Sequence, residues 1–175
     1  MMEFRRHGFD GTSIKALERA TGLSSGSLYN SFGDKNAIFI KTLARYNRVI
    51  VAQRIDEHLT RKQPAAGLRS FFLSLLDEPD DDIIGCLLTN SAIEFGGGDS
   101  MASAGVTAGF ELQEKAFMAT AVRLFPHSRS IKEKALKLLA LYQGVLVLFR
   151  SGHPKQKLAA MITHELDRML GEDNV

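Results

Sequence analysis

The chain has 175 residues, of which 45% are hydrophobic, so it can form one domain or a small domain joined to a larger one, and wholesale disorder is excluded. Its net charge of +2 is unevenly spread, because residues 1–62 carry eleven Lys and Arg against six Asp and Glu, a net +5, and the remainder carries a net −3. A basic amino-terminal part indicates a polyanionic partner, although chance clustering of solvated charges would produce the same asymmetry.

The amino-terminal third of the chain is predicted to form two short helices and a long one. Thr12 or Ser13 caps the first helix, and Gly22 ends it in a left-handed conformation. The second helix covers about residues 24–33 and the third about 34–59, where a following proline ends the pattern. The third helix would be about 40 Å long, enough to connect two domains.

The rest of the chain shows helical periodicity and no alternating strand pattern, so the predicted fold class is all-α. The charged segment 77–82 and the glycine-rich segment 96–105 are predicted to be loops. The longest apolar run, 138–149, is too short to cross a bilayer, so we expect no membrane partner. The helices predicted in this part cover residues 67–76, 83–95, 106–125, 130–150 and 155–170.

The two short helices form a helix-turn-helix pattern in which apolar residues point one way and small polar residues the other. Leu28 and Phe32 lie four positions apart and are expected to pack inward, as is Leu23 in the turn. Small side chains let the amino terminus of the second helix approach a surface, where its free N–H groups favour phosphate. The alternative is that the serines only cap an ordinary helical turn. The residues expected on the outer face, where they can bond phosphates or base edges, are Ser24, Ser25, Gly26, Ser27 and Asn30.

Residues 4–39, FRRHGFDGTSIKALERATGLSSGSLYNSFGDKNAIF, resemble the amino-terminal domain of TetR-family transcriptional regulators. The resemblance implies a helix-turn-helix DNA-binding head over 1–45. The long helix would join this head to an antiparallel helical-bundle body over 46–175 that binds ligand and dimerises. It also implies a homodimer that represses transcription from a palindromic double-stranded DNA operator, and that a small apolar or amphipathic effector releases.

The resemblance assigns DNA contacts beyond the outer face of the second helix. Thr12 and Lys35 would each contact a phosphate, and Tyr29 would touch the DNA backbone. A second resemblance lies within residues 83–95, where a Gly-Cys-Leu is followed by Asn and Glu, as in the sixth helix of many family members.

The chain departs from the family in its first helix, because only MMEFRRH precedes Gly8. Loss of a full helix would remove apolar cover from Ile14, Leu17, Leu28 and Phe32, at roughly 1.5–3 kcal/mol for each side chain exposed. The two consecutive methionines suggest a start assigned too far downstream. The alternative is a real truncation, which would leave a small-molecule-binding helical dimer whose head no longer binds DNA specifically.

The body is expected to contain both an effector pocket and a dimer interface. The last two helices carry more apolar surface than one core needs, which favours a four-helix interface between two subunits, although both helices could simply close the monomer's own core. Pockets between bundle helices are lined by aromatic and a few polar side chains. The aromatic candidates could equally be core residues, and the acidic one could cap a neighbouring element. The candidate ligand-binding residues are Phe72, Asn90, Glu94, Gln113, Phe117 and Tyr142.

No pattern in the sequence indicates catalysis, a cofactor or a metal site. The five histidines lack metal-ligand spacing, and no nucleophile and base occur at a supporting spacing, so we expect that the protein is not an enzyme and binds no cofactor. Cys86 lies in an apolar predicted helix away from Lys and Arg, so it is expected to be buried and structural rather than a redox sensor. A single cysteine excludes an internal disulfide and suits a reducing cytosol, so we expect a cytoplasmic protein.

Overall fold

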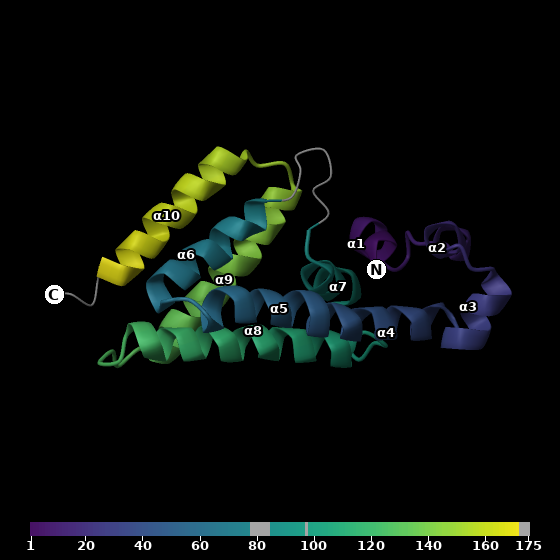
Figure 1. Cartoon of the computed structure of the whole chain (residues 1–175), viewed down its shortest axis with the longest axis horizontal. Helices are drawn as coiled ribbons and strands as arrows, with labels where there is room; N and C mark the ends of the chain where they lie inside the picture. The colour runs from purple at the N-terminus through teal and green to yellow at the C-terminus, as the bar shows by residue number, and fades with distance from the viewer. Residues whose placement is uncertain (78–84, 97, 172–175) are drawn as a thin grey trace. The chain divides into compact units, whose positions relative to one another are not determined.

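The computed structural model describes residues 1–77, 85–96 and 98–171, and within these ranges every regular element is a helix (Figure 1). The chain divides into two compact units. The first comprises Met1–Ile50 and Ile84–Phe110, and the second comprises Val51–Ile83 and Glu111–Val175. We call the first unit the head and the second the body.

Side-chain caps set the beginnings of the three helices that follow α1 in the head. Ser13, Ser24 and Asp34 each accept a hydrogen bond from a backbone N–H in the first turn of the helix that they precede. Gly22 ends the first of these helices in the left-handed conformation, with φ of 70°, as predicted. The helices are α1 (Met2–His7), α2 (Ile14–Thr21), α3 (Ser25–Phe32) and α4 (Lys35–Tyr46).

The predicted long helix over 34–59 is confirmed as a continuous helical path that crosses from the head into the body. Two five-residue π-helical segments interrupt its α-helical geometry, which the sequence pattern did not indicate. After α4 the path continues through η1 (Asn47–Val51), α5 (Ala52–Ile55) and η2 (Asp56–Thr60).

An aromatic cluster forms the centre of the head and brings α1, α4 and α7 (Leu87–Phe95) together. Phe4 and Phe39 are fully buried, with ring centroids 5.0 Å apart. Phe9 and Phe95 lie 5.2 and 5.5 Å from Phe39. Residues 84–110, which the sequence analysis placed in the body, therefore group with the head, because α7 contributes to the head's core.

The first turns of α8 (Ser103–Leu124) also pack inside the head. The amide of Asn47 donates to the Gly105 carbonyl at 2.7 Å. Gly109 lies so close to η1 and α7 that an added Cβ would be 2.7 Å from both Asn47 Oδ1 and Leu88. This close approach requires glycine and packs the first turns of α8 against the rest of the head.

The short first helix does not uncover the apolar side of α2 and α3, contrary to expectation. Leu17 and Leu28 are 4% and 1% exposed. The inward packing predicted for Phe32 and Leu23 is wrong, since these side chains are 38% and 43% exposed. Phe32 is the last residue of α3, and its ring lies against the Lys41 ammonium, 5.4 Å from the ring centroid, instead of in the core.

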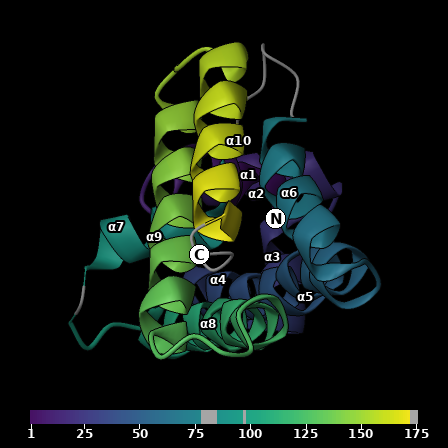
Figure 2. The ribbon, with the colours of Figure 1, turned by 90° about the vertical axis from the view of Figure 1, so that its left-hand side faces the viewer.

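The body consists of antiparallel helices around a second aromatic cluster. Figure 2 shows α9 and α10 lying side by side, and both carry buried apolar residues along one side. Burial lowers the pKa of His58, and the nearby Lys62 and Arg54 lower it further. Beyond η2 and the carboxy-terminal part of α8, the helices of the body are α6 (Pro64–Leu73), η3 (Ser74–Leu76), α9 (Ile131–Arg150) and α10 (Lys155–Gly171).

The helix predicted over 83–95 begins later than expected, at Leu87. Cys86 is the extended residue that precedes α7, not a residue within the helix. Its side chain is 4% exposed and its sulfur accepts a hydrogen bond from the Tyr46 hydroxyl at 3.3 Å, so the prediction of a buried cysteine is confirmed. Of the loop predicted over 77–82, residues 78–82 lie outside the described residues.

Replacing Phe4 by Ala should lower the free energy of unfolding of the head by about 3–5 kcal/mol, because it leaves a cavity beside Phe39. Urea denaturation followed by circular dichroism measures the change. The control is Met2→Ala, since Met2 is 42% exposed on the same helix and should change stability by less than about 0.5 kcal/mol. Equal effects of the two substitutions would contradict a core role for Phe4.

Candidate nucleic-acid interface

The amino terminus of α3 is held by neighbouring side chains. The Ser24 hydroxyl accepts the Ser27 N–H at 3.2 Å and lies 3.1 Å from the Ser27 hydroxyl. The carboxylate of Glu18 on α2 accepts the Ser25 N–H at 2.5 Å. Two of the N–H groups expected to be free for phosphate are therefore already bonded within the head, and Glu18 fixes α3 to α2.

The outer face of α3 carries the small polar side chains that the sequence pattern predicts there. Ser24, Gly26, Ser27 and Asn30 are exposed, whereas Ser25 is half-buried against α2. A Cβ added to Gly26 would meet nothing closer than the Ser24 hydroxyl oxygen, at 3.9 Å, so the surface is open at this point. Such a face presents hydroxyl and amide groups to any surface that approaches α3 closely.

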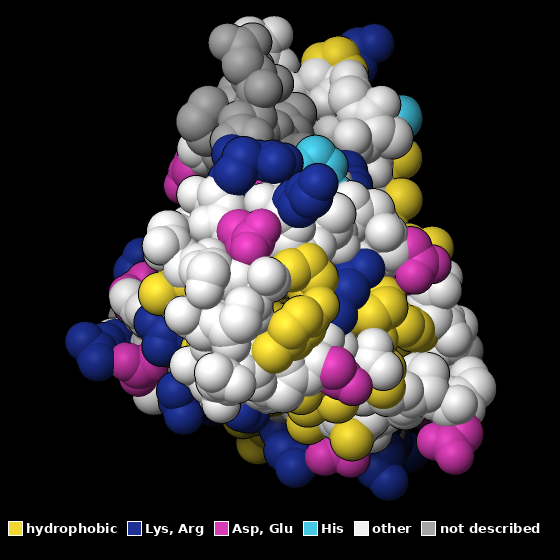
Figure 3. All heavy atoms as spheres, turned by 90° about the vertical axis from the view of Figure 1, so that its right-hand side faces the viewer, with side chains coloured by type: hydrophobic (Ala, Val, Ile, Leu, Met, Phe, Trp, Pro, Cys, Tyr) yellow, Lys and Arg dark blue, Asp and Glu magenta, His cyan; other side chains and the backbone are white. Residues whose placement is uncertain are grey.

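Figure 3 shows the side of the molecule on which α3 lies in Figure 1. Lys and Arg side chains are spread over this face, with a group in its upper part and one between the apolar patches near its middle. Tyr29, exposed to 45%, and Phe32 and Leu23 contribute apolar surface to α3 and the turn before it.

Two residues assigned phosphate contacts have partners inside the head. Thr12 is fully buried, and its hydroxyl donates to the Gly8 carbonyl at 2.6 Å, so the phosphate contact expected of it stays a prediction that this arrangement does not support. Lys35 is half-buried, and its ammonium lies 4.2 Å from the centroid of the Phe9 ring. Its contact with a phosphate stays a prediction.

Sequence reasoning missed Lys41 as a basic group beside α3. Its ammonium donates to the Phe32 carbonyl at 3.4 Å and lies over the Phe32 ring, which places an exposed positive charge at the carboxy-terminal end of α3. The signal available in the sequence was the Asp34 cap, which places Lys41 two turns into α4.

Asn90 and Glu94 belong to the head and not to a body pocket. Both carboxylate oxygens of Glu94 accept backbone N–H groups, from Phe9 and Asp10, each at 2.9 Å. The Asn90 amide donates to the Arg5 carbonyl at 3.2 Å. Glu94 is therefore the cap of a neighbouring element, which was the alternative to a pocket acid.

The aromatic ligand-binding candidates form the core of the body. Phe72, Phe117 and Tyr142 are at most 4% exposed, and their ring centroids lie 5.8–6.1 Å apart. Gln113 is 1% exposed; its side-chain oxygen accepts the Gln143 amide at 2.8 Å, and its own amide nitrogen is buried with no hydrogen-bond partner. Gln113 Nε2 is therefore a buried donor of the body that no described group satisfies.

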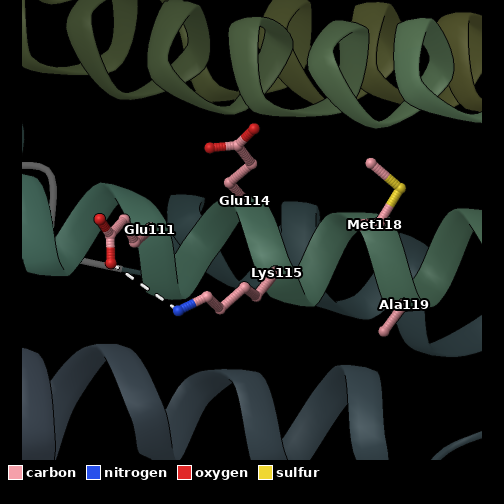
Figure 4. Close-up of a pocket in the computed structure, with 5 residues that line it drawn as sticks. All are labelled: Glu111, Glu114, Lys115, Met118 and Ala119. Carbon is pink, nitrogen blue, oxygen red and sulfur yellow. Dashed lines mark ion pairs between the residues drawn. The ribbon is translucent and has the colours of Figure 1, made fainter.

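An open groove of about 460 Å³ runs along the exposed side of α8 (Figure 4). Glu111 and Lys115 form an ion pair across one turn at its edge, 3.7 Å apart. None of the six predicted ligand-binding residues is among the described residues that line it, which are Glu111, Glu114, Lys115, Met118 and Ala119.

Metal and membrane features are not found in the described ranges. No group of three or more His, Cys, Asp or Glu side chains there could hold a metal ion. Of the helices in residues 1–77, 85–96 and 98–171, none combines the length and apolar character needed to span a bilayer.

A capped pair of short helices with an open polar face, attached to a helical body, defines a helix-turn-helix protein. Residues 1–42 match the sequence profile of the family described as "Bacterial regulatory proteins, tetR family". This amino-terminal segment is therefore similar to the corresponding part of TetR-family transcriptional regulators.

Similar proteins include the HTH-type transcriptional repressor AcnR of Corynebacterium efficiens, 32% identical over 77 residues, or 44% of this chain. The match spans only 36% of that repressor's length, so the chain aligns with about a third of the curated relative. A solved TetR-family regulator from Streptomyces avermitilis covers 98% of this chain and 92% of its own, with a TM-score of 0.80 and 21% identity. The regulator CifR, solved in complex with a 26-bp double-strand operator DNA, covers 95% of this chain and 91% of its own at a TM-score of 0.80 and 21% identity. These structural similarities show the fold.

Replacing Ser24 by Ala should destabilise the head by about 1 kcal/mol, because the Ser27 N–H loses its cap at the start of α3. Ser31→Ala is the matched control, since Ser31 is exposed on the same helix and should change stability by less than about 0.5 kcal/mol. Urea denaturation of both variants measures the difference. If Ser24→Ala is as stable as Ser31→Ala, the cap does not hold α3.

Proposed function

We propose that the protein is a DNA-binding transcriptional repressor that acts as a homodimer on a palindromic operator. The observation that carries this proposal is α3: an exposed, capped short helix with Ser, Gly and Asn on its outer face, in a chain whose head matches the TetR family. The operator complex of CifR, which shares the fold, and the repressor name of the C. efficiens relative support it.

In this proposal α3 is the recognition helix and enters the major groove. Asn30 suits adenine because its amide can both donate and accept, and the exposed hydroxyls of Ser24 and Ser27 can reach phosphates or base edges. Gly26 leaves room for the close approach, and Tyr29 would pack against the sugar–phosphate backbone. Lys41, and Lys35 if it leaves the Phe9 ring, would contribute sequence-independent attraction.

The structure does not favour the alternative hypothesis, a small-molecule-binding dimer whose head no longer binds DNA specifically. A disabled head would expose the apolar side of α2 and α3, whereas Phe4, Leu17 and Leu28 are at most 4% exposed. The head therefore has a formed core that supports the recognition helix.

Dimerisation through α9 is supported by an apolar face that the subunit's own core does not use. Leu136 and Val147 are 63% and 44% exposed, and Ala140 and Gly144 lie between them on the same side of the helix. A Cβ on Gly144 would meet nothing within 4 Å. A second copy packed here would bury this face, and twofold symmetry would match a palindromic operator whose half-sites lie about 34 Å apart.

A small apolar or amphipathic effector would release the repressor from its operator. The support for this release is Gln113, whose buried amide nitrogen lacks a partner and could donate to an oxygen of a small amphipathic molecule. Such a molecule would loosen operator binding only if it bound the released state more tightly than the operator-bound state.

Asn30→Ala should weaken binding to the operator about tenfold or more, because one amide contact to a base edge is lost. Fluorescence anisotropy with a duplex that the wild-type protein selects from a random library, at several salt concentrations, measures the effect. Lys132→Ala is the control, because Lys132 is exposed at the start of α9 in the body. Equal affinities for Asn30→Ala and wild type would contradict a base contact by Asn30.

Val147→Glu should convert the dimer into a monomer, because it buries a charge within the proposed apolar interface. Size-exclusion chromatography with light scattering measures the mass. Val122→Glu provides the same change at a residue that is 49% exposed on α8. Loss of the dimer in both variants, or in neither, would argue against the α9 interface.

A further inference from the structure

Glu94 of α7 holds the loop after α1 through both of its carboxylate oxygens. Its two carboxylate oxygens each accept one N–H, from the consecutive residues Phe9 and Asp10, at 2.9 Å. Gly8, with φ of 71°, turns the chain so that these N–H groups face the carboxylate. A Cβ on Gly8 would be 2.8 and 3.0 Å from the two Glu94 oxygens, so only glycine leaves them room.

The loop that Glu94 holds leads directly into α2. The Thr12 hydroxyl, fully buried, donates to the Gly8 carbonyl at 2.6 Å, and the Thr12 N–H donates to the Phe9 carbonyl at 3.2 Å. The next residue, Ser13, caps α2, and Glu18 of α2 in turn bonds to the Ser25 N–H at the start of α3. A series of short polar contacts therefore connects Glu94 to the amino terminus of the recognition helix.

The position of Glu94 itself is fixed by two further contacts between α1 and the α7 region. The Asn90 amide donates to the Arg5 carbonyl at 3.2 Å, one turn before Glu94. The Arg5 guanidinium donates to the Gly85 carbonyl through Nε at 2.9 Å and through Nη2 at 2.6 Å. These contacts, with the Phe9–Phe95 ring pair, keep the carboxylate facing the loop.

We propose that Glu94 is a positioning residue for DNA recognition: by fixing the Gly8–Asp10 loop it sets the direction in which α2 and α3 leave the core of the head. This inference rests on the proposed function, because it assigns Glu94 a role in the DNA affinity of that same head. Glu94 would touch no DNA, and its negative charge by itself would oppose binding to a polyanion.

Glu94→Gln separates two effects on DNA affinity, because removing the charge and removing the loop contact should change that affinity in opposite directions. The glutamine oxygen can accept one of the two N–H groups, but its NH₂ group then faces the other donor. Loss of charge alone should strengthen binding to every duplex, whereas loss of positioning should weaken binding to the recognised duplex only. We expect about tenfold weaker binding to the duplex that the wild type selects from a random library, and equal or tighter binding to an unselected duplex.

Glu114→Gln is the matched control, because Glu114 is exposed on α8 in the body and the charge change is the same. It should leave the ratio of selected to unselected affinity unchanged. Both variants are compared by anisotropy well below their melting temperatures, which circular dichroism measures first. A reduction in that ratio for Glu94→Gln but not for Glu114→Gln supports the proposal.

Gly8→Ala tests the same contact from the loop side without changing the charge. Its Cβ would displace the carboxylate, so it should reproduce the reduced affinity ratio, and the double variant Gly8→Ala/Glu94→Gln should be no worse than either single variant. Hydrogen exchange should show faster exchange of at least one of the Phe9 and Asp10 amides in Glu94→Gln and of both in Gly8→Ala. This measurement tests the contact even if one variant is too unstable for DNA binding.

The proposal is overturned if Glu94→Gln binds the selected duplex as tightly as the wild type or more tightly, or if the Phe9 and Asp10 amides keep their protection. A wild-type protein that selects no duplex would instead overturn the proposed function, and the role of Glu94 in recognition with it. The exchange measurement separates the two failures, because it depends only on the contact.

Discussion

The packing of Phe4, Phe9 and Phe95 around Phe39 is the interaction on which the rest of the head depends. Each ring comes from a different segment, and the centroids of Phe4, Phe9 and Phe95 lie 5.0–5.5 Å from that of Phe39. A six-residue helix such as α1 is not stable alone in water, so its place in the head is determined by the burial of Phe4. The same cluster brings α7 into the head and so places Glu94 against the loop that leads to α2.

The polar contacts of the head then determine the direction of its helices, which burial alone leaves free. Hydrophobic packing is non-directional, whereas a carboxylate that accepts two N–H groups or a serine that caps a helix fixes an orientation. Glu94, Ser13, Glu18 and Ser24 supply such contacts, which lead in space from the core of the head to the start of α3. A helix that enters a DNA groove needs a fixed orientation, because its few base contacts are lost when the helix is displaced.

In the body, the residues expected to surround an effector are the ones that fill the core. Phe72, Phe117 and Tyr142 pack on one another, as an aromatic stripe at helical spacing indicates for a helical core, and their part in ligand binding stays a prediction. Gln113 differs from them, since it is buried with an unbonded amide nitrogen. Asn90 and Glu94 were grouped with these residues by their apolar helix, and only the packing of α7 on α1 shows that they belong to the head.

The sequence by itself determined the all-α class, the order of the helices, the capping residues and the outer face of α3. These features follow from local rules: capping, glycine conformations and a 3.6-residue period act within one turn of the chain. Only the tertiary structure decided that Thr12 is buried while Phe32 and Leu23 are exposed, and that α7 and the first turns of α8 complete the head. The physical reason is that burial and long-range hydrogen bonds depend on residues up to 85 positions apart, such as Phe9 and Glu94, whose meeting no local pattern encodes.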